Sequence, residues 1–173
     1  MKKRKIVVLR GYLAAGKSTT FNNLKKNKKM KDWVFLDFPA IRKLYNNFNI
    51  KTQISLADMT FFNIMRELLK TRKNILTQET SNERLIKELG EEIKKNNYNV
   101  DIIVLTISKE TSLKRDTERR NKKGIKLRTK KEVYENYNKR IKKLLDGKIY
   151  LDTEKNSEKQ IVDKIIKRIN QDE

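Results

Sequence analysis

One stretch near the start of the chain constrains its fold more than any other. The apolar residues 6–9 (Ile-Val-Val-Leu) precede residues 11–19 (Gly-Tyr-Leu-Ala-Ala-Gly-Lys-Ser-Thr), and the second segment fits the spacing G-x-x-x-x-G-K-[ST]. A buried strand, such a loop and a following helix bring backbone N–H groups and a helix N-terminus onto one anion. The alternative, a chance match in an ordinary glycine turn, is disfavoured because a strand and a helix-forming segment flank the loop. The stretch therefore predicts a nucleoside-triphosphate site.

Each fixed position of this loop has a chemical role. Gly11 and Gly16 can adopt backbone angles that other residues resist, so that successive N–H groups can converge on a phosphate. Lys17 is expected to reach the β- and γ-phosphates, and the Ser18 hydroxyl is expected to ligate Mg²⁺. The residues expected to contact the nucleotide here are Gly11, Ala14, Ala15, Gly16, Lys17, Ser18 and Thr19.

The composition narrows the chemistry that is available. The 173 residues include no Cys and no His, which excludes disulfides, thiolate nucleophiles, imidazole bases and the usual zinc sites. Acid–base chemistry must then use carboxylates, Lys, Tyr or water. No apolar run is long enough for a membrane span, and the run after the basic residues 1–5 is too short for a signal peptide. We therefore expect a single cytoplasmic domain over residues 1–173 that does not bind membranes.

The charge is strongly positive, with 43 Lys and Arg against 22 Asp and Glu and a formal net charge of +21. Such a surplus favours polyanionic partners such as nucleic acid. Genome bias is the alternative, because Lys, Asn and Ile are abundant here and Gly, Pro and Ala are scarce. Lys also greatly outnumbers Arg, whereas surfaces that recognise bases tend to use Arg.

Strand and helix signals alternate along the whole chain. Continuous apolar runs predict buried strands at residues 5–10, 33–36, 74–77, 101–107 and 148–151. Helices are predicted at residues 17–28, from Pro39, at 55–71, 82–95 and 108–121, and after possible capping boxes at Thr129 and Ser157. This order predicts an α/β fold, a five-stranded parallel sheet with helices on both faces.

Two of these helices carry more detailed expectations. The helix at 55–71 is predicted to open with a capping box at residues 55–58. Its expected apolar face consists of Met59, Phe62, Met65 and Leu69. The helix at 82–95 is expected to bury Leu85, Ile86, Leu89 and Ile93.

Ligands of parallel sheets bind at the carboxyl ends of the strands. That edge is expected to gather the loop, Asp37, Glu79 and the charged stretch after Ile107. In this stretch Arg115, Arg119 and Arg120 have near-helical spacing, and Arg115 and Arg119 share a helix face. They could compensate the charge of a phosphoryl group in transfer. The alternative is a solvated helix in which Asp116 and Glu118 pair locally.

At this point the chain resembles the small P-loop kinases, within them the polynucleotide 5′-hydroxyl kinases and the related zeta-toxin-like kinases. Residues 9–19 are similar to the opening of the phage-type polynucleotide kinases, and residues 113–124 with 134–137 resemble their Arg-rich lid and the following helix. The resemblance spans nearly the whole chain. It implies the P-loop kinase fold, a lid at about residues 113–128, and transfer of the ATP γ-phosphate to a 5′-hydroxyl end of DNA or RNA with Mg²⁺.

The resemblance also assigns roles to residues outside the loop. It makes Asp37 the general base, Arg42 an acceptor-binding residue, and Asp152 and Thr153 the start of the loop that contacts adenine. These kinases often carry an Asp three residues before the Arg, where this chain has Pro39. Asp37 could instead end its strand or cap the next helix.

Three further hypotheses stay open. Glu79 and Thr80 resemble a pair in the zeta-toxin-like kinases, so that Glu79 could hold Mg²⁺ through water, bind an acceptor hydroxyl, or act outside the site. The acceptor could be a small molecule, either a nucleoside, a sugar or a nucleotide sugar. A non-kinase NTPase fits less well, because no apolar strand ends in Asp-Glu and no extra domain is predicted. The sequence does not predict an oligomeric state.

Overall fold

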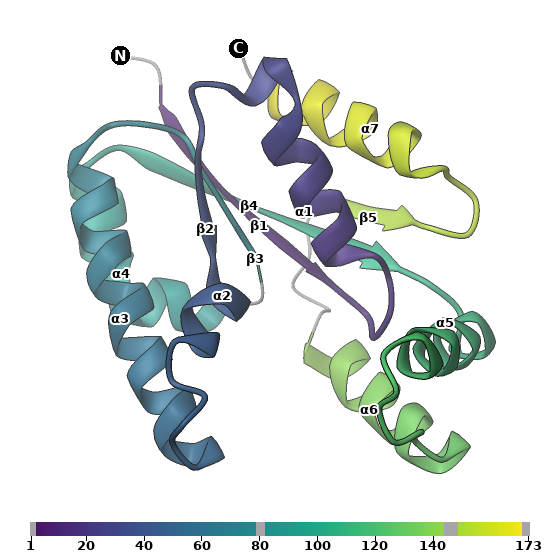
Figure 1. Ribbon diagram of the computed structural model, residues 1–173. Coiled ribbons are helices and arrows are strands. Elements are labelled where there is room, and N and C mark those ends of the chain that lie inside the picture. The colour runs from purple at the N-terminus through teal and green to yellow at the C-terminus, as the bar shows by residue number, and fades with distance from the viewer. Residues whose placement is uncertain (1–2, 79–81, 144–148, 171–173) are drawn as a thin grey trace. The chain divides into compact units, whose positions relative to one another are not determined.

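The computed structural model describes residues 3–78, 82–143 and 149–170. Five strands form a parallel sheet in the order β2-β3-β1-β4-β5 (Figure 1). They are β1 (Arg4–Gly11), β2 (Val34–Asp37), β3 (Ile75–Gln78), β4 (Tyr98–Thr106) and β5 (Ile149–Asp152). The predicted α/β fold with five parallel strands is therefore confirmed.

Helices connect these strands, as the alternating sequence pattern predicts. They are α1 (Lys17–Lys26), α2 (Phe38–Lys43), α3 (Ile50–Lys70), α4 (Asn82–Lys95), α5 (Lys109–Lys122), α6 (Lys130–Lys143) and α7 (Glu158–Asn170), with a short 3₁₀ helix, η1 (Lys28–Met30). In the described ranges, none of the helices has the length and apolarity that crossing a membrane requires.

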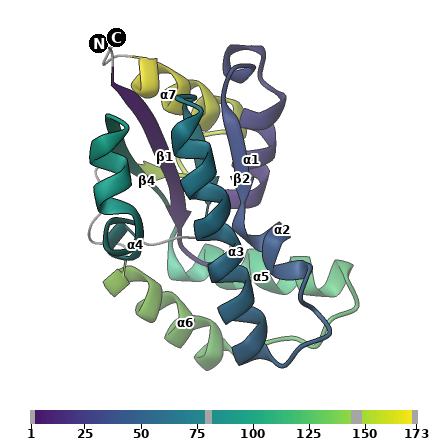
Figure 2. The ribbon, with the colours of Figure 1, turned by 90° about the vertical axis from the view of Figure 1, so that its left-hand side faces the viewer.

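The chain divides into two compact units, and each is described by itself. The first unit comprises residues up to Leu9 and residues 27–101. In it, Leu9 of β1 and Asp37 of β2 both lie beside Gln78 of β3. Helix α3 packs against α2 and α4 (Figure 2). The core of this unit includes Phe61, Met65, Leu69, Leu85 and Leu89.

The second unit comprises residues 10–26 and the residues from 102 onward. Helix α1 packs against α7 (Figure 1), and the Asn23 amide donates to a carboxylate oxygen of Glu158 at 3.3 Å. Helix α5 packs against α6. Fully or nearly fully buried apolar side chains of this unit include Phe21, Leu24, Ile103, Val104, Leu105, Ile161 and Ile165.

The predicted start of the third helix is wrong. Helix α3 begins at Ile50, where the Asn49 side chain accepts a hydrogen bond from the N–H of Thr52 at 3.0 Å. Asn caps a helix as well as Ser does, and the cap at Asn49 leaves Ser55 inside α3 with its side chain exposed.

Two predicted core residues lie at the surface. Met59 is 57 % exposed and Ile86 is 47 % exposed. On α4 the buried side chains Leu85, Leu89 and Ile93 repeat every four residues. Ile86 stands about 100° around the helix from Leu85 and so falls outside that narrow stripe.

Both later capping boxes are confirmed. Thr129 and Glu132 exchange hydrogen bonds at the start of α6, with the Thr129 N–H 2.7 Å from a Glu132 carboxylate oxygen. Ser157 and Gln160 do the same at the start of α7.

Candidate active site

The phosphate-loop candidate, residues 11–19, is held in place from two sides. The Tyr12 N–H donates to the carbonyl oxygen of Leu105 on β4 at 3.1 Å. The buried Ser112 hydroxyl, on α5, donates to the carbonyl oxygen of Leu13 at 2.8 Å. Because both anchors belong to regular elements of the second unit, rigid structure supports the loop in addition to its internal bond from the Ala15 N–H to the Tyr12 carbonyl oxygen at 3.2 Å.

The loop backbone adopts angles that few residues tolerate. Ala14 has φ +57° and Gly16 has φ +79°. A left-handed conformation costs a non-glycine residue about 1–2 kcal/mol, and such strain tends to persist at functional sites. The left-handed geometry also makes successive N–H groups point toward one region, which is how backbone nests bind anions.

Lys17 directs its positive charge over this loop. Its Nζ lies 3.3 Å from the carbonyl oxygens of both Gly11 and Tyr12. The same residue begins α1, and the carbonyl of Gly16 accepts the first helical hydrogen bond, from Thr20 at 2.9 Å. The ammonium group and the positive end of the α1 dipole would therefore both attract an anion placed at this loop.

The residues near the start of α1 suit a divalent cation that is held mainly by phosphates. Ser18 and Thr19 are exposed in the first turn of α1. In the described ranges, no three acidic side chains gather into a metal site. Mg²⁺ typically keeps its waters and takes few protein ligands besides substrate phosphates, so a lone Ser18 hydroxyl fits this mode of binding.

Gly11 must be glycine because β4 passes so close to it. A methyl group at position 11 would lie 2.8 Å from the carbonyl oxygen of Leu105 and 3.2 Å from Cγ of Lys17. We expect Gly11→Ala to lower the free energy of unfolding by about 1–3 kcal/mol, because the added atom forces the backbone apart. Urea unfolding measures this change.

Gly90→Ala is the matched control. In the middle of α4 the added methyl group would lie 3.6 Å from the Ile86 side chain, an ordinary contact. Alanine there should stabilise the protein by about 0.4–1 kcal/mol, since it restricts the unfolded chain. Equal effects of the two variants would contradict the close approach at Gly11.

Arg115, which was expected beside the γ-phosphate, contacts the loop that follows β5. Its guanidinium donates to the hydroxyl and to the carbonyl oxygen of Thr153, both at 3.3 Å. Thr153 in turn bonds to the Thr106 carbonyl of β4. The Asp152 carboxylate accepts the N–H of Glu154 at 2.8 Å and so shapes the same loop. The structure thus brings three predicted site residues together.

Arg119 and Arg120 form a second group around Asp116. The Arg120 Nε donates to Asp116 Oδ2 at 3.1 Å, and an Arg119 guanidinium N–H donates to Asp116 Oδ1. Asp116 therefore pairs locally, as the alternative interpretation expected, but its side chain is buried rather than solvated. The three arginines do not form one cluster.

The loop after β5 is also joined to the start of α5 through Glu154. Its carboxylate accepts hydrogen bonds from the Thr111 hydroxyl and from the backbone N–H and hydroxyl of Ser108. These bonds, that of Thr111 above all, lower the pKa of Glu154. The carboxylate therefore stays ionised to lower pH than an ordinary glutamate and secures the loop that carries Asp152 and Thr153.

Asp37, the predicted base, lies in the first unit at the carboxyl end of β2. Its Oδ1 accepts the Nε2–H of Gln78 at 2.8 Å and, more weakly, the N–H of Ala40 at 3.4 Å. The second bond makes Asp37 the N-cap of α2, which was the alternative role considered for it. The capping role and a base role are compatible, because both bonds described for the carboxylate end on Oδ1.

Arg42, the predicted acceptor-binding residue, lies at the end of α2 with its side chain exposed. Its Nε donates to Oε1 of Gln53 on α3 at 3.2 Å. Gln53 donates in turn to the Asn46 side chain. Glu79 and Thr80 lie outside the described residues.

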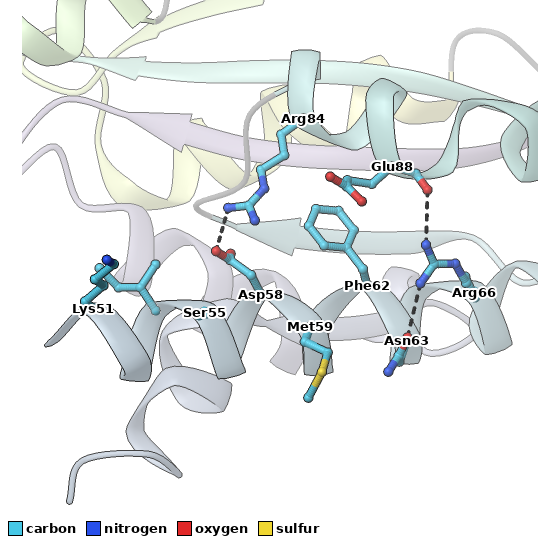
Figure 3. A pocket seen from close by; sticks show the side chains of 10 residues that line it. Lys51, Ser55, Asp58, Met59, Phe62, Asn63, Arg66, Arg84 and Glu88 are labelled. Carbon is cyan, nitrogen blue, oxygen red and sulfur yellow. Dashed lines mark hydrogen bonds and ion pairs between the residues drawn. The ribbon is translucent and has the colours of Figure 1, made fainter. Parts of the chain in front are cut away.

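A pocket of about 480 Å³ lies on the first unit, lined by α3 and α4 (Figure 3). Arg84 bonds to Asp58 at 2.6 Å and places its guanidinium over the Phe62 ring. Arg66 donates to the Asn63 side chain and to the Glu88 carbonyl. Predicted site residues are missing from its described lining, and the charge of Arg84 is already matched by Asp58.

Sequence reasoning missed three contributors to these groups. Gln78 holds Asp37, Ser112 holds the phosphate loop, and Arg128 lies 3.6 Å from the Asp116 carboxylate. By contrast, the i, i+3 and i, i+4 spacing from Asp116 to Arg119 and Arg120 did indicate that these side chains pair. Gln78 and Ser112 act across sheet and helix contacts, for which local sequence carries no signal.

The family model described as Zeta toxin matches residues 1–158, which is most of the chain. Curated proteins give no match. Among solved structures, a candidate kinase from Chloroflexus aurantiacus j-10-fl has a TM-score of 0.77 at 13 % identity and covers all of both chains. The shikimate kinase of Acinetobacter baumannii, solved with shikimate, has a TM-score of 0.59 at 16 % identity and covers 97 % of this chain and 93 % of its own.

A third similar structure is a chain of the Pnkp1/Rnl/Hen1 RNA repair complex. Its TM-score is 0.62 at 17 % identity, and the match covers 83 % of this chain but 46 % of that one. At these identities the structural likeness supports the fold and leaves the substrate open.

Proposed function

Because this chain belongs to the zeta toxin family of P-loop kinases, we propose that it transfers the γ-phosphate of ATP to an alcohol, and that this alcohol is the 5′-hydroxyl end of a DNA or RNA strand. The observation that carries the kinase proposal is the phosphate loop. It combines left-handed backbone at Ala14 and Gly16 with the Lys17 ammonium directly over it. This is the arrangement that phosphoryl transfer needs for positioning and for charge compensation.

In this mechanism the phosphate loop supplies position and charge rather than covalent chemistry. The loop N–H groups and Lys17 would bind the β- and γ-phosphates, and the Ser18 hydroxyl would hold Mg²⁺. When bound, Mg²⁺ offsets negative charge on the phosphate oxygens. Asp152 and Thr153 begin the loop that we assign to adenine, and Arg115 holds that loop at Thr153.

We assign the acceptor side to Asp37. Gln78 and Ala40 fix Oδ1 of the carboxylate, which leaves Oδ2 to accept the proton of the attacking hydroxyl. A carboxylate whose orientation is already fixed loses little conformational entropy when it receives that proton. Arg42, whose side chain is exposed, would bind the acceptor beside it.

Two observations support a polynucleotide acceptor. The net charge of +21 favours a polyanion, and the fold is shared with a chain of an RNA repair complex. A small-molecule acceptor is the second candidate, favoured by the family match and by the shikimate kinase likeness. Glu79 and Thr80 are then the first residues to test.

Salt dependence separates these two acceptors. With a 5′-hydroxyl oligonucleotide, we expect the acceptor KM to rise by about tenfold or more between about 50 and 200 mM salt, because binding releases counterions from several phosphates. The KM for ATP, which depends mainly on the phosphate loop, should change much less. Transfer from labelled ATP gives both constants.

The same assay contains its own comparison. Nucleosides and sugars carry no phosphodiester backbone, so their KM should be nearly flat over this range of salt. An oligonucleotide KM that stays flat, or no labelling of 5′-hydroxyl ends at any salt, would reject the polynucleotide acceptor. Labelling of a small acceptor would then establish the second candidate.

A further inference from the structure

Asp116 is a buried carboxylate that is surrounded by arginines. Its side chain is 1 % exposed, and Arg119, Arg120 and Arg128 all lie within 4 Å of its oxygens. Arg119 and Arg120 come from the next turn of the same helix, α5. Arg128 comes from the segment between α5 and α6. We call these four residues the Asp116 cluster.

The cluster ties that segment to the helix. Arg120 donates its Nε–H to Asp116 and a second N–H to the carbonyl oxygen of Lys126. The Ile125 N–H donates to the carbonyl oxygen of Arg120 at 3.0 Å. Helix α5 ends at Lys122 with Lys123 as its C-cap, and Gly124 follows with φ +60°. The chain therefore turns back on α5, and this turn brings Arg128 to Asp116.

The charges in the cluster do not balance. One carboxylate faces three guanidinium groups, so the cluster keeps a net charge of about +2. Burying a carboxylate is costly unless it is paired, which explains why Asp116 attracts the arginines. The arginines gain less from the pairing than the carboxylate does, because Arg119 is 49 % and Arg128 is 33 % exposed and water can solvate them. This surplus of positive charge favours the binding of a further anion.

The bonds to Asp116 leave most of the arginine donors available. A guanidinium has five N–H groups, and the hydrogen bonds to Asp116 use one from Arg119 and one from Arg120. Each arginine can therefore bind Asp116 and a phosphate oxygen at the same time. Asp116 need not be displaced for the arginines to act.

We propose that Asp116 is a positioning residue for phosphoryl transfer, and that Arg128 acts with Arg119 and Arg120 on the transferred group. Asp116 holds the three guanidinium groups together against their mutual repulsion, so that their charge is in place before the reaction. This inference rests on the proposed kinase function, and it adds two residues to the site. It also gives the buried Asp116 carboxylate a role beyond stabilising the turn that follows α5.

The main test is Asp116→Asn, which keeps the size of the side chain but loses its charge. We expect kcat per folded protein to fall about 10–100-fold, as is usual when a residue that orients a charged group is lost. The KM for ATP should stay within about threefold, because the phosphate loop is untouched. Glu118→Gln, an exposed acid on the same helix, is the matched control and should leave both constants unchanged.

A double-mutant cycle separates positioning from a structural role. If Asp116 acts through Arg128, Asp116→Asn should cost much less in an Arg128→Ala protein than in the wild type. Arg128→Ala by itself should lower kcat about tenfold. It should still fold, because its side chain is partly exposed in a connecting segment, so the proposal stays testable even if Asp116→Asn does not fold. Additive losses, or a kcat within threefold of wild type for Asp116→Asn, would overturn the proposal.

A measurement without an acceptor distinguishes this inference from the proposed function. The Nε–H resonances of Arg119, Arg120 and Arg128 should shift when the non-hydrolysable ATP analogue AMP-PNP is added but not when AMP is added. Asp116→Asn should abolish these shifts. Shifts that persist in that variant, or that are missing in the wild type, would reject the positioning role. A wild type that shows the shifts and yet phosphorylates no acceptor would reject the kinase function instead.

Discussion

Lys17→Ala should lower phosphate transfer by about three orders of magnitude or more while the protein stays folded. The Lys17 ammonium lies 3.3 Å from two carbonyl oxygens of the loop. In a preorganised site, removing one donor to a developing anion costs about 10²–10³ in kcat, and here a full charge is removed as well. Labelled-ATP transfer and thermal unfolding measure the two properties.

Lys25→Ala provides the control, because Lys25 is an exposed lysine on the same helix, α1. It removes the same charge from the protein and should leave transfer unchanged. Activity of Lys17→Ala within tenfold of wild type would reject the phosphate-loop assignment. A loss of equal size in both variants would point to net charge rather than to position.

Asp37→Asn should lower kcat by about two to four orders of magnitude, with a small change in the KM for ATP. Asn caps helices as well as Asp, and its carbonyl oxygen can still accept the bonds from Gln78 and Ala40. The substitution therefore preserves the cap and removes mainly the basic oxygen. Steady-state kinetics with the acceptor identified by screening measures both constants.

Asp32→Asn, an exposed acid five residues earlier, is the control for charge. If Asp37→Asn stays active and Glu79→Gln shows the loss instead, then Glu79 is the base. A stable and fully active Asp37→Asn would leave Asp37 with its capping role alone.

Local chemistry made much of the fold predictable. The capping boxes at Thr129 and Ser157 were read correctly because both partners lie within four residues of each other. Ser55 fits the same pattern but lies inside α3, since Asn49, earlier in the chain, provides an equally good cap. Capping preferences alone do not decide between two possible helix starts, because tertiary packing of the whole helix determines where it begins.

In the candidate site too, local features could be predicted from the sequence and contacts between distant residues could not. The loop was predictable because its chemistry lies in nine consecutive residues. The arginines were identified as a group and local pairing with Asp116 was one alternative, but the contact of Arg115 with Thr153 was not foreseen, because a long side chain reaches positions that residue spacing does not determine. Arg115 binds Thr153 and Arg119 binds Asp116, although the two arginines lie one helical turn apart.

The two hydrogen bonds that anchor the phosphate loop constrain the sequence to different degrees during evolution. The bond from Tyr12 to Leu105 joins one main chain to another, so that almost any amino acid at position 105 can provide it. The bond from Ser112 to Leu13 needs a hydroxyl, and among buried side chains only serine and threonine offer one of similar size. The first anchor therefore places no side-chain requirement on position 105, whereas the second restricts position 112 to serine or threonine during evolution.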